Sequence, residues 1–290
     1  LADGAVNVSE NQNNRVKKNK NNYSIDFDID SKKPNLNDNI EAIKALKELE
    51  KTGKQANKEQ KAILAKYKGW GGLANAFYYG NELNTLLTEE ELKAARASTN
   101  TSFYTSKTLI DNMYKILNKL GLKGGNLLEP AMGTGNFFGY IPKSLSANTN
   151  LYGVEIDSLT GRIAQKLYPD TNIEISPFQD VKFKENSFDA IIGNVPFLDV
   201  PYKYKGKKYN LHDYFFVKSL DLVREGGIVA FITSTGTMDK MSTTLRSELS
   251  DKANLVAAYR LPSKAFANAG TDVVTDLIIL QKRNENAEKN

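Results

Sequence analysis

The sequence of 290 residues has no cysteine and only one histidine. Zinc sites built from cysteine and histidine are therefore excluded, as are cysteine nucleophiles and disulfide bonds. A hydrolase that uses Ser, His and Asp would have to act through His212. This residue opens an apolar stretch typical of a helix, so we interpret it as structural or as adjacent to a substrate. We expect no bound metal.

Long apolar segments are also missing from the sequence. No run approaches the roughly 20 residues that cross a membrane as a helix, and no signal peptide is recognisable. We therefore expect a cytoplasmic protein. The net charge of +5 and the pI near 9.0 permit binding to nucleic acid but do not require it. The chain begins with Leu1 rather than Met, which indicates a fragment or a processed product.

Composition divides the chain into a tail, a helical extension, a main domain and a polar end, at residues 1–36, 37–99, 100–283 and 284–290. The tail is rich in Asn and Lys without an apolar pattern, so we expect it to be disordered or loosely attached. The extension has apolar residues at helical spacing, such as Ile40, Ile43 and Leu46. Asn37 and Asp38 are the candidates for its first helix cap.

Helices and strands alternate through the main domain, which predicts an α/β fold. Strands are expected at 126–130, 151–156, 172–176, 188–193, 227–233, 254–260 and 273–281. The last strand follows its predecessor after a short link, which favours an antiparallel insertion beside the sixth. We predict a doubly wound, mostly parallel seven-stranded sheet that binds its ligand at the carboxyl ends of the strands.

The first of these strands runs into a Gly-x-Gly loop at Gly133 and Gly135, where the backbone can approach a ligand closely. The third glycine of the dinucleotide motif is missing, because Phe138 stands there. Glu129 would repel a phosphate but attract an amine. With Ala131 in the same loop, this pattern fits the methionyl end of S-adenosylmethionine (SAM) better than NAD.

The second strand ends in Glu155, about twenty residues past the glycine loop, where doubly wound folds hold a ribose diol. We assign Glu155 this role, and Ile156 could cover one face of an adenine. The alternative is that Glu155 caps the next helix, in competition with Asp157 and Ser158.

Asn194, Val195, Pro196 and Phe197 follow the fourth strand. The Asn194 amide oxygen and the Val195 carbonyl can both accept from an exocyclic amino group. Pro196 fixes its own φ and keeps Val195 extended, and Phe197 offers a flat face to a base. The alternative is a purely structural role, in which the strand ends in a proline turn.

In this order the motifs resemble the N6-adenine DNA methyltransferases in which the SAM motifs precede the catalytic tetrapeptide. More narrowly, they resemble the methyltransferase region of large phage and conjugative-element methyltransferase–helicase proteins. The strings that carry this resemblance are 39–43, 67–73, 193–197, 212–216 and 270–272. The resemblance covers about residues 37 to 283. It implies SAM as cofactor, adenine-containing DNA as substrate and further domains, such as a helicase, in a longer protein.

The resemblance also implies roles for residues outside the central motifs. Tyr104 and Thr105 belong to the segment that precedes the glycine loop, and Phe266 to a segment that supplies the far wall of the base pocket. Phe178 could pack on the cofactor's adenine. Either Asp180 or Gln179 could take the hydrogen bond of the adenine amino group. The tetrapeptide departs from the commonest form, Asn-Pro-Pro-Tyr, at Val195 and Phe197.

A loop rich in lysine and tyrosine follows the tetrapeptide, at residues 201–209. It suits phosphate contacts and base stacking, although a solvated loop would look similar. Its candidate nucleic-acid contacts are Lys203, Lys205, Lys207 and Lys208. A base inside a duplex cannot reach such a pocket, so the target adenine must flip out or be unpaired.

Three alternatives remain open at this level. The same chemistry could act on an RNA base or a protein glutamine, or the domain could bind DNA without catalysis. An NAD enzyme is disfavoured by the missing glycine. The turn at 69–72 carries the only tryptophan. We favour a role in plugging the helical extension onto the main domain over a lid near cofactor or DNA.

Overall fold

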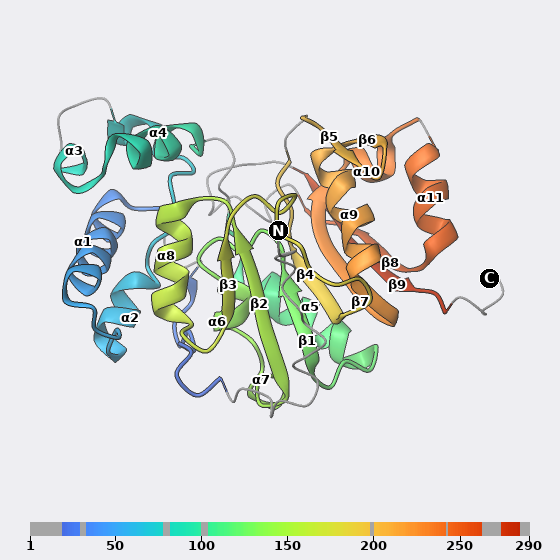
Figure 1. The fold of residues 1–290 in the computed structure, drawn as a ribbon, viewed down its shortest axis with the longest axis horizontal. Helices are drawn as coiled ribbons and strands as arrows, with labels where there is room; N and C mark the ends of the chain where they lie inside the picture. Colours follow the sequence, from blue (N-terminus) through green and yellow to red (C-terminus); the bar gives the residue numbers. More distant parts are fainter. Residues whose placement is uncertain are drawn as a thin grey trace, which may run out of the picture.

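A seven-stranded sheet forms the centre of the molecule (Figure 1). The structure is a computed structural model that describes residues 19–29, 33–77, 82–99, 104–197, 200–241, 243–262 and 274–284. In chain order the strands of the sheet are β1 (Gly125–Glu129), β2 (Thr149–Glu155), β3 (Asn172–Ile175), β4 (Phe188–Asn194), β7 (Val223–Ser234), β8 (Ala253–Arg260) and β9 (Thr275–Lys282). Their order across the sheet is β3-β2-β1-β4-β7-β9-β8. The pairs β7–β9 and β9–β8 are antiparallel, and the other pairs are parallel. The predicted fold is confirmed.

Helices cover both faces of this sheet. Side chains alternate along each strand, so Leu127 faces one hydrophobic core and Leu128 the other. The first core includes α5 (Lys107–Lys119), α6 (Asn136–Gly139), α7 (Lys143–Ser146) and α8 (Ser158–Leu167). The second includes α9 (Leu211–Leu222) and α11 (Thr244–Lys252), and the short α10 (Gly236–Asp239) follows β7. Within the described residues, no helix is long and apolar enough to span a membrane.

The helical extension lies against α8 (Figure 1). It consists of α1 (Leu36–Thr52), α2 (Lys58–Leu64), the 3-10 helix η3 (Ala74–Phe77), α3 (Leu83–Leu86) and α4 (Glu89–Ala97). The apolar positions predicted for α1 are buried, but its cap is Asn35, whose side chain accepts from the Asn37 N–H. Ion pairs connect α1 and α4 to α8. Arg162 of α8 pairs with Glu50 of α1 at 2.8 Å and also with Glu91 of α4.

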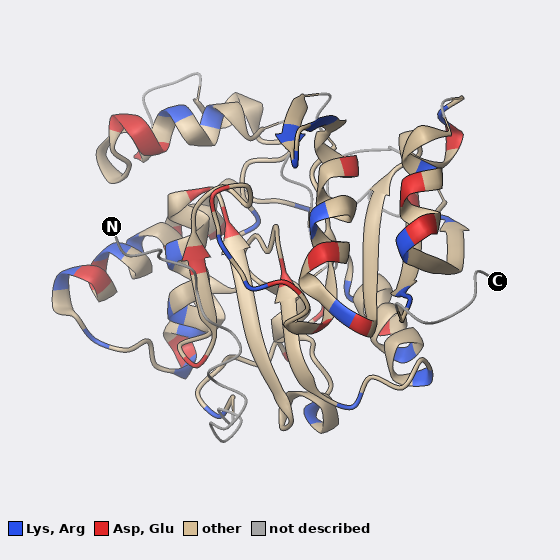
Figure 2. Cartoon of the chain, turned by 45° about the vertical axis from the view of Figure 1, so that its right-hand side comes forward, with Lys and Arg blue, Asp and Glu red and all other residues tan. Residues whose placement is uncertain are grey.

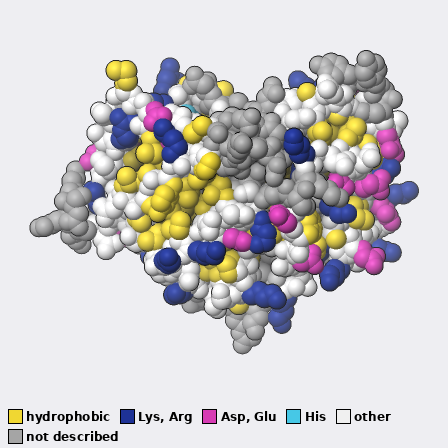
Figure 3. All heavy atoms as spheres, turned by 180° about the vertical axis from the view of Figure 1, so that it is seen from behind, with side chains coloured by type: hydrophobic (Ala, Val, Ile, Leu, Met, Phe, Trp, Pro, Cys, Tyr) yellow, Lys and Arg dark blue, Asp and Glu magenta, His cyan; other side chains and the backbone are white. Residues whose placement is uncertain are grey.

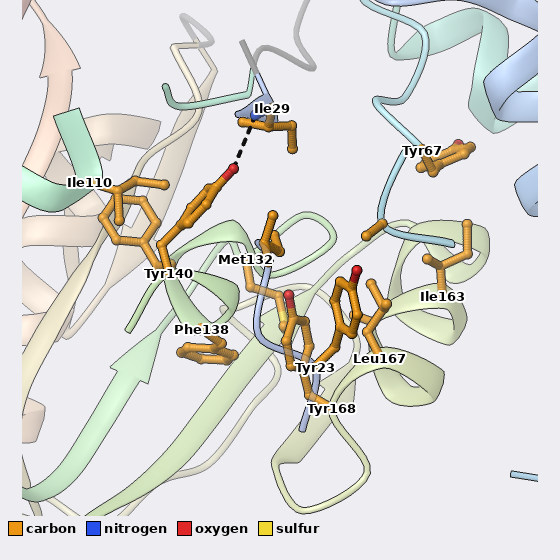
Figure 4. Close-up of a cluster of buried hydrophobic side chains, with 14 of the residues drawn as sticks. Tyr23, Ile29, Tyr67, Ile110, Met132, Phe138, Tyr140, Ile163, Leu167 and Tyr168 are labelled. Atoms are coloured by element: carbon orange, nitrogen blue, oxygen red, sulfur yellow. Dashed lines mark hydrogen bonds between the residues drawn. The ribbon is translucent and has the colours of Figure 1, made fainter. Parts of the chain in front are cut away.

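The tail differs from expectation over residues 19–29, which are firmly attached. The Tyr23 N–H donates to the Leu167 carbonyl and the Ile25 N–H to the Gly139 carbonyl, both at 2.9 Å. Figure 4 shows Tyr23 and Ile29 beside the aromatic cluster of Phe138, Tyr140 and Tyr168. The sequence signal was the alternation of Tyr23, Ile25, Phe27 and Ile29 with polar residues, which marks an extended segment with one buried face. Residues 1–18 lie outside the described residues.

The lysine-rich loop is a β-hairpin rather than a solvated loop. Its strands are β5 (Pro201–Tyr204) and β6 (Lys207–Asn210), paired antiparallel. The two turn residues, Lys205 and Gly206, have φ values of 46° and 81°. Two consecutive residues with positive φ make the tight turn that matches the twist of a hairpin. A lysine is uncommon at such a position, which is why the sequence did not predict a turn there.

One edge of the sheet carries exposed apolar side chains. Leu255 and Tyr259 of the edge strand β8 are 63% and 51% exposed, and Val274 just before β9 is 37% exposed. Figure 3, a view from behind, shows hydrophobic side chains gathered on the side of the molecule that carries β8 and β9. None of these three residues lines the cavity described below.

We predict that Ile25→Ala lowers the free energy of unfolding by about 2–4 kcal/mol, because a buried aliphatic side chain leaves a cavity beneath Gly139. Urea denaturation followed by circular dichroism measures this. The matched control, Lys20→Ala at an exposed position of the same segment, should change stability by less than about 0.5 kcal/mol. Equal stability of Ile25→Ala and wild type would show that the segment is only loosely attached.

Candidate cofactor and substrate site

A cavity of about 290 Å³ lies at the carboxyl ends of β1, β2 and β4. The loops that follow these parallel strands meet at one edge of the sheet, where doubly wound folds bind ligands. Of the residues predicted for the site, those that line this cavity are Tyr104, Thr105, Glu129, Ala131, Gly133, Glu155, Ile156, Phe178, Asn194, Val195, Pro196 and Phe197. Segments separated by about ninety residues in the sequence thus share one cavity.

The glycine loop has a left-handed backbone at both of its glycines. Gly133 and Gly135 have φ values of 56° and 83°, which side-chain-bearing residues rarely adopt. A Cβ atom on Gly133 would lie 3.2 Å from the Tyr104 ring, and one on Gly135 would lie 2.7 Å from the Tyr168 ring. Gly135 is not among the lining residues. Its part is therefore to let the loop pass closely over Tyr168.

Glu155 lies at the end of β2 and closes the glycine loop. Its carboxylate accepts hydrogen bonds from the Gly133 and Asp157 N–H groups, each at 2.8 Å. Burial raises the pKa of Glu155 to about 7. The helix that follows is capped by Asp157, which accepts from the Thr160 N–H at 2.8 Å. Glu155 is therefore not the helix cap, and its carboxylate is available at the cavity wall.

Glu129 is a buried acid without a full set of hydrogen bonds. It is 3% exposed, and among the described residues its Oε2 atom has no hydrogen-bond partner. Burial, with the neighbouring Glu155 as a smaller cause, raises the pKa of Glu129 well above its ordinary value. A buried carboxyl group of this kind is costly unless it finds a donor or a cation. The hydrogen-bond acceptors at this end of the cavity therefore suit an ammonium group, which donates hydrogen bonds.

The tetrapeptide is anchored by its second residue. Asn194 ends β4, and the Val195 N–H donates to the Ile232 carbonyl of β7 at 3.0 Å. Val195 is 1% exposed, while Phe197 is partly buried and packs against the first core. The backbone at Val195 is thus held by its hydrogen bond to β7. Asn194 and Val195 both line the cavity that Glu129 and Glu155 also line.

Aromatic and aliphatic side chains line another part of the cavity. Ile156 is 67% exposed, although aliphatic side chains of this size are usually buried. Phe178 is 4% exposed and lies 5.0 Å from the ring of Phe215 at an interplanar angle of 31°. Lys218 holds this turn by donating to the Phe178 and Val181 carbonyls. Flat and aliphatic surfaces of this kind suit an adenine ring.

Gln179 rather than Asp180 lines the cavity. Asp180 is exposed, and its charge acts on Lys218, which burial shifts to a pKa of about 8. Phe266 lies outside the described residues. Several other lining residues were not predicted, among them Tyr202 of the hairpin, Leu211 and Phe215 of α9, and Gly69, Trp70 and Ser98 of the helical extension. The Tyr202 ring stacks on Tyr214 at 5.6 Å and 23°. The alternation of tyrosine and lysine in 201–209 was the available signal for it.

The four lysines of the hairpin fall into two groups. Lys205 pairs with Asp221 at 2.8 Å and with Glu185 at 2.7 Å, and Lys207 pairs with Glu248 at 3.2 Å. Lys203 and Lys208 are directly opposite each other across the two strands. Both are exposed, and neither forms an ion pair within the described part of the chain. Figure 2 shows basic residues on this hairpin at the top of the molecule.

Glu129→Gln should make the free energy of unfolding less dependent on pH. Because the pKa of Glu129 is raised on folding, the folded chain keeps a proton that the unfolded chain loses above about pH 4.5. Stability from this group therefore falls as the pH rises. Urea denaturation between about pH 5 and 8 measures the free energy of unfolding as a function of pH. The slope of that plot should be smaller in the variant by the equivalent of up to about one proton. The control Glu90→Gln, at an exposed position of α4, should keep the wild-type slope. Identical slopes for all three proteins would contradict the assignment.

The chain is similar to known proteins over most of its length. The family model of the N-6 DNA methylases matches residues 86–290. Defense against restriction protein B of Escherichia phage P1 is 32% identical over 243 residues, which cover 80% of this chain and 9% of the phage protein. Modification methylase CviBIII of Paramecium bursaria Chlorella virus NC1A is 28% identical over 152 residues, 50% of this chain and 40% of that protein. This chain thus spans less than half the length of either relative.

A solved structure shows the same fold. A Listeria monocytogenes protein described as a class I S-adenosylmethionine-dependent methyltransferase superposes with a TM-score of 0.55 at 14% identity. The match covers 88% of this chain and 90% of that one. The resemblance noted in the sequence is confirmed: this chain belongs to the N-6 DNA methylase family.

Proposed function

We propose that this chain transfers a methyl group from SAM to the exocyclic N6 atom of adenine in DNA. The observation that carries the proposal is the single cavity, in which the Asn194 tetrapeptide lies with Glu129 and Glu155. One end offers carboxylates for a cofactor, and the other offers hydrogen-bond acceptors and an aromatic ring for a base. Family membership supports methylation, and the composition of the cavity supports an amino group of a planar base as the acceptor.

The residues present fit SAM as the methyl donor. When bound, SAM supplies an electrophilic methyl group on a sulfonium centre. Glu129 would hold the ammonium group. This group would donate a hydrogen bond to the Oε2 atom, which has no partner among the described residues. Glu155 would hold the ribose hydroxyls, and Phe178 and Ile156 would enclose the adenine ring. An NAD pyrophosphate fits less well, because Phe138 replaces the third glycine of the dinucleotide motif.

Asn194 and Val195 would prepare the acceptor nitrogen. The lone pair of adenine N6 is delocalised into the ring, so the amino group is a poor nucleophile. The Asn194 Oδ1 atom and the Val195 carbonyl would each accept one N6 hydrogen. Two acceptors out of the ring plane favour a more tetrahedral nitrogen, whose lone pair then points at the methyl donor. The N6 lone pair would form the new N–C bond while the S–CH3 bond breaks and its electron pair stays on sulfur as a neutral thioether. The methylated nitrogen would then release one proton to water, so the chain needs no general base. Its rate would come from positioning and fixed dipoles.

The acceptor adenine must reach this cavity outside a base stack. Phe197 would stack on the flipped or unpaired base, and Tyr202 of the hairpin lines the same cavity. The hairpin thus connects the base pocket to the basic surface of Lys203 and Lys208. The pairing of like charges across two strands is unfavourable in isolation, and a phosphate between them would offset it. Lys205 and Lys207 instead hold the hairpin onto carboxylates of the domain.

We also propose that the chain is part of a larger protein of a mobile element. Its phage relative is much longer, since the match covers only 9% of that protein. Further domains, such as a helicase, would then supply recognition of the target sequence.

Asn194→Ala should reduce methyl transfer by at least about 100-fold, because one of two acceptors of the amino group is lost, while SAM binding stays within about twofold. Transfer from radiolabelled SAM to single- and double-stranded DNA, with the modified base identified by mass spectrometry, measures this. Asn148→Ala is the matched control, at an exposed position before β2 on the opposite edge of the sheet. Methylation of RNA or of a protein glutamine instead of adenine, or equal loss of transfer and SAM binding, would contradict the proposal.

Replacing Lys203 and Lys208 together by Gln should weaken binding to all DNA sequences alike. The slope of the logarithm of affinity against the logarithm of salt concentration should fall by about 1–2, since each phosphate contact contributes close to 0.9. Fluorescence anisotropy with two unrelated DNA sequences at four salt concentrations measures this. Lys119→Gln, at the exposed end of α5, is the control. An effect confined to one of the two sequences would show that these lysines read bases rather than phosphates.

A further inference from the structure

The helical extension contributes a wall to the cavity. Gly69 and Trp70 line it together with Thr105, Asp157 and Thr160 of the main domain. Tyr67, just before this turn, lies close to the carboxylate end. Burial, then the neighbouring Tyr104 and Asp157, raise the pKa of its hydroxyl well above the ordinary value. The turn at 68–72, which we call the tryptophan turn, therefore lies beside the residues that surround Glu155.

One buried asparagine holds the tryptophan turn in place. Asn39 of α1 is 0% exposed and uses both ends of its amide. Its Nδ2 group donates to the Gly69 carbonyl at 2.6 Å, and its Oδ1 atom accepts from the Lys68 N–H at 3.0 Å. Gly69 and Gly72 have φ values of 63° and 72°, which require glycine. The conformation of the tryptophan turn is thus fixed by two hydrogen bonds from one buried side chain and by two glycines with positive φ.

The indole ring of Trp70 is fixed on its other sides. It meets Tyr67 edge-on at 6.1 Å and 89°, and Phe77 at 5.0 Å and 57°. It is 2% exposed, so it cannot turn toward solvent without breaking both contacts. The ion pairs of Arg162 with Glu50 and Glu91 then join the extension to α8, whose first turn contains Thr160. Ion pairs therefore connect the helical extension, which carries Trp70, to α8, which carries Thr160 on the other side of this part of the cavity.

We propose that the tryptophan turn is part of the cofactor subsite and that Trp70 contacts the adenosyl portion of the bound cofactor. This inference rests on the proposed function, because it assumes that the cavity holds SAM. Trp70 lines the cavity close to Glu155, and the small part of its surface that is exposed there offers apolar contact to a nucleoside. The extension then plugs onto the main domain and also completes the site, so the main domain alone would bind the cofactor poorly.

The chain reports on this contact directly, because Trp70 is its only tryptophan. Titration with S-adenosylhomocysteine should change the tryptophan emission saturably. The dissociation constant from emission should agree with that from calorimetry on the same protein. Calorimetric binding with unchanged emission would overturn this inference and leave the proposed function standing. No calorimetric binding would overturn the proposed function and this inference with it.

Two variants distinguish the loss of the cofactor contact from a general loss of folding. Trp70→Phe and Asn39→Leu should each weaken S-adenosylhomocysteine binding by about fivefold to tenfold, since each loses interactions worth a little over 1 kcal/mol. They should raise KM for SAM and leave KM for DNA unchanged, which a general loss of structure would not do. Lys44→Gln, which removes only the pairs of Lys44 with Glu41 and Glu82, should bind normally. Wild-type affinity in Trp70→Phe would overturn the inference even if Asn39→Leu fails to fold.

Discussion

The burial of two carboxyl groups at one edge of a parallel sheet is the constraint on which the rest of this structure depends. β1 and β2 are adjacent and parallel, with Glu129 paired in register with Gly153, so Glu129 and Glu155 end within the same small volume. Charges cannot be buried in this way without an energetic cost. Glu155 recovers part of that cost from the Gly133 and Asp157 N–H groups. The cost left at Glu129 favours a cationic ligand over an empty site.

The elements around the acids keep the cavity in shape. Met132, beneath the glycine loop, would collide with any Cβ atom on Gly153, and Tyr168 with one on Gly135. The segment 19–29 closes this cluster from below, since Ile25 lies against Gly139. Close approach of backbone to side chains leaves little room for adjustment, because protein interiors are as dense as organic crystals. The conformation of the loop therefore depends on Tyr168 and Ile25, which lie outside the cavity, as well as on Met132, which lines it.

Much of this could be predicted from the sequence, because the signals were local. Strands with helices between them, two glycines, a strand-end acid and the Asn194 tetrapeptide each follow from a few neighbouring residues, and sheet topology alone then places them at one edge. The hairpin and the segment 19–29 were missed. The first depends on a lysine with positive φ, and the second on an alternation masked by a polar composition.

Other features depend on contacts between distant residues. The pairing of Lys205 with Asp221 and the hydrogen bonds of Asn39 to a turn thirty residues away have no local signal. The choice of Gln179 over Asp180 at the cavity wall also follows only from how the turn held by Lys218 packs. Side-chain partnerships of this kind explain why the residues of the site could be predicted better than their individual roles.

A crystal structure of the chain with S-adenosylhomocysteine would test the central claim most directly. The account predicts the amino group of the ligand within hydrogen-bond distance of the Glu129 carboxylate, and the ribose hydroxyls on Glu155. A ligand bound in the cavity with its ribose away from Glu155, or bound elsewhere with Glu129 still unpartnered, would contradict it.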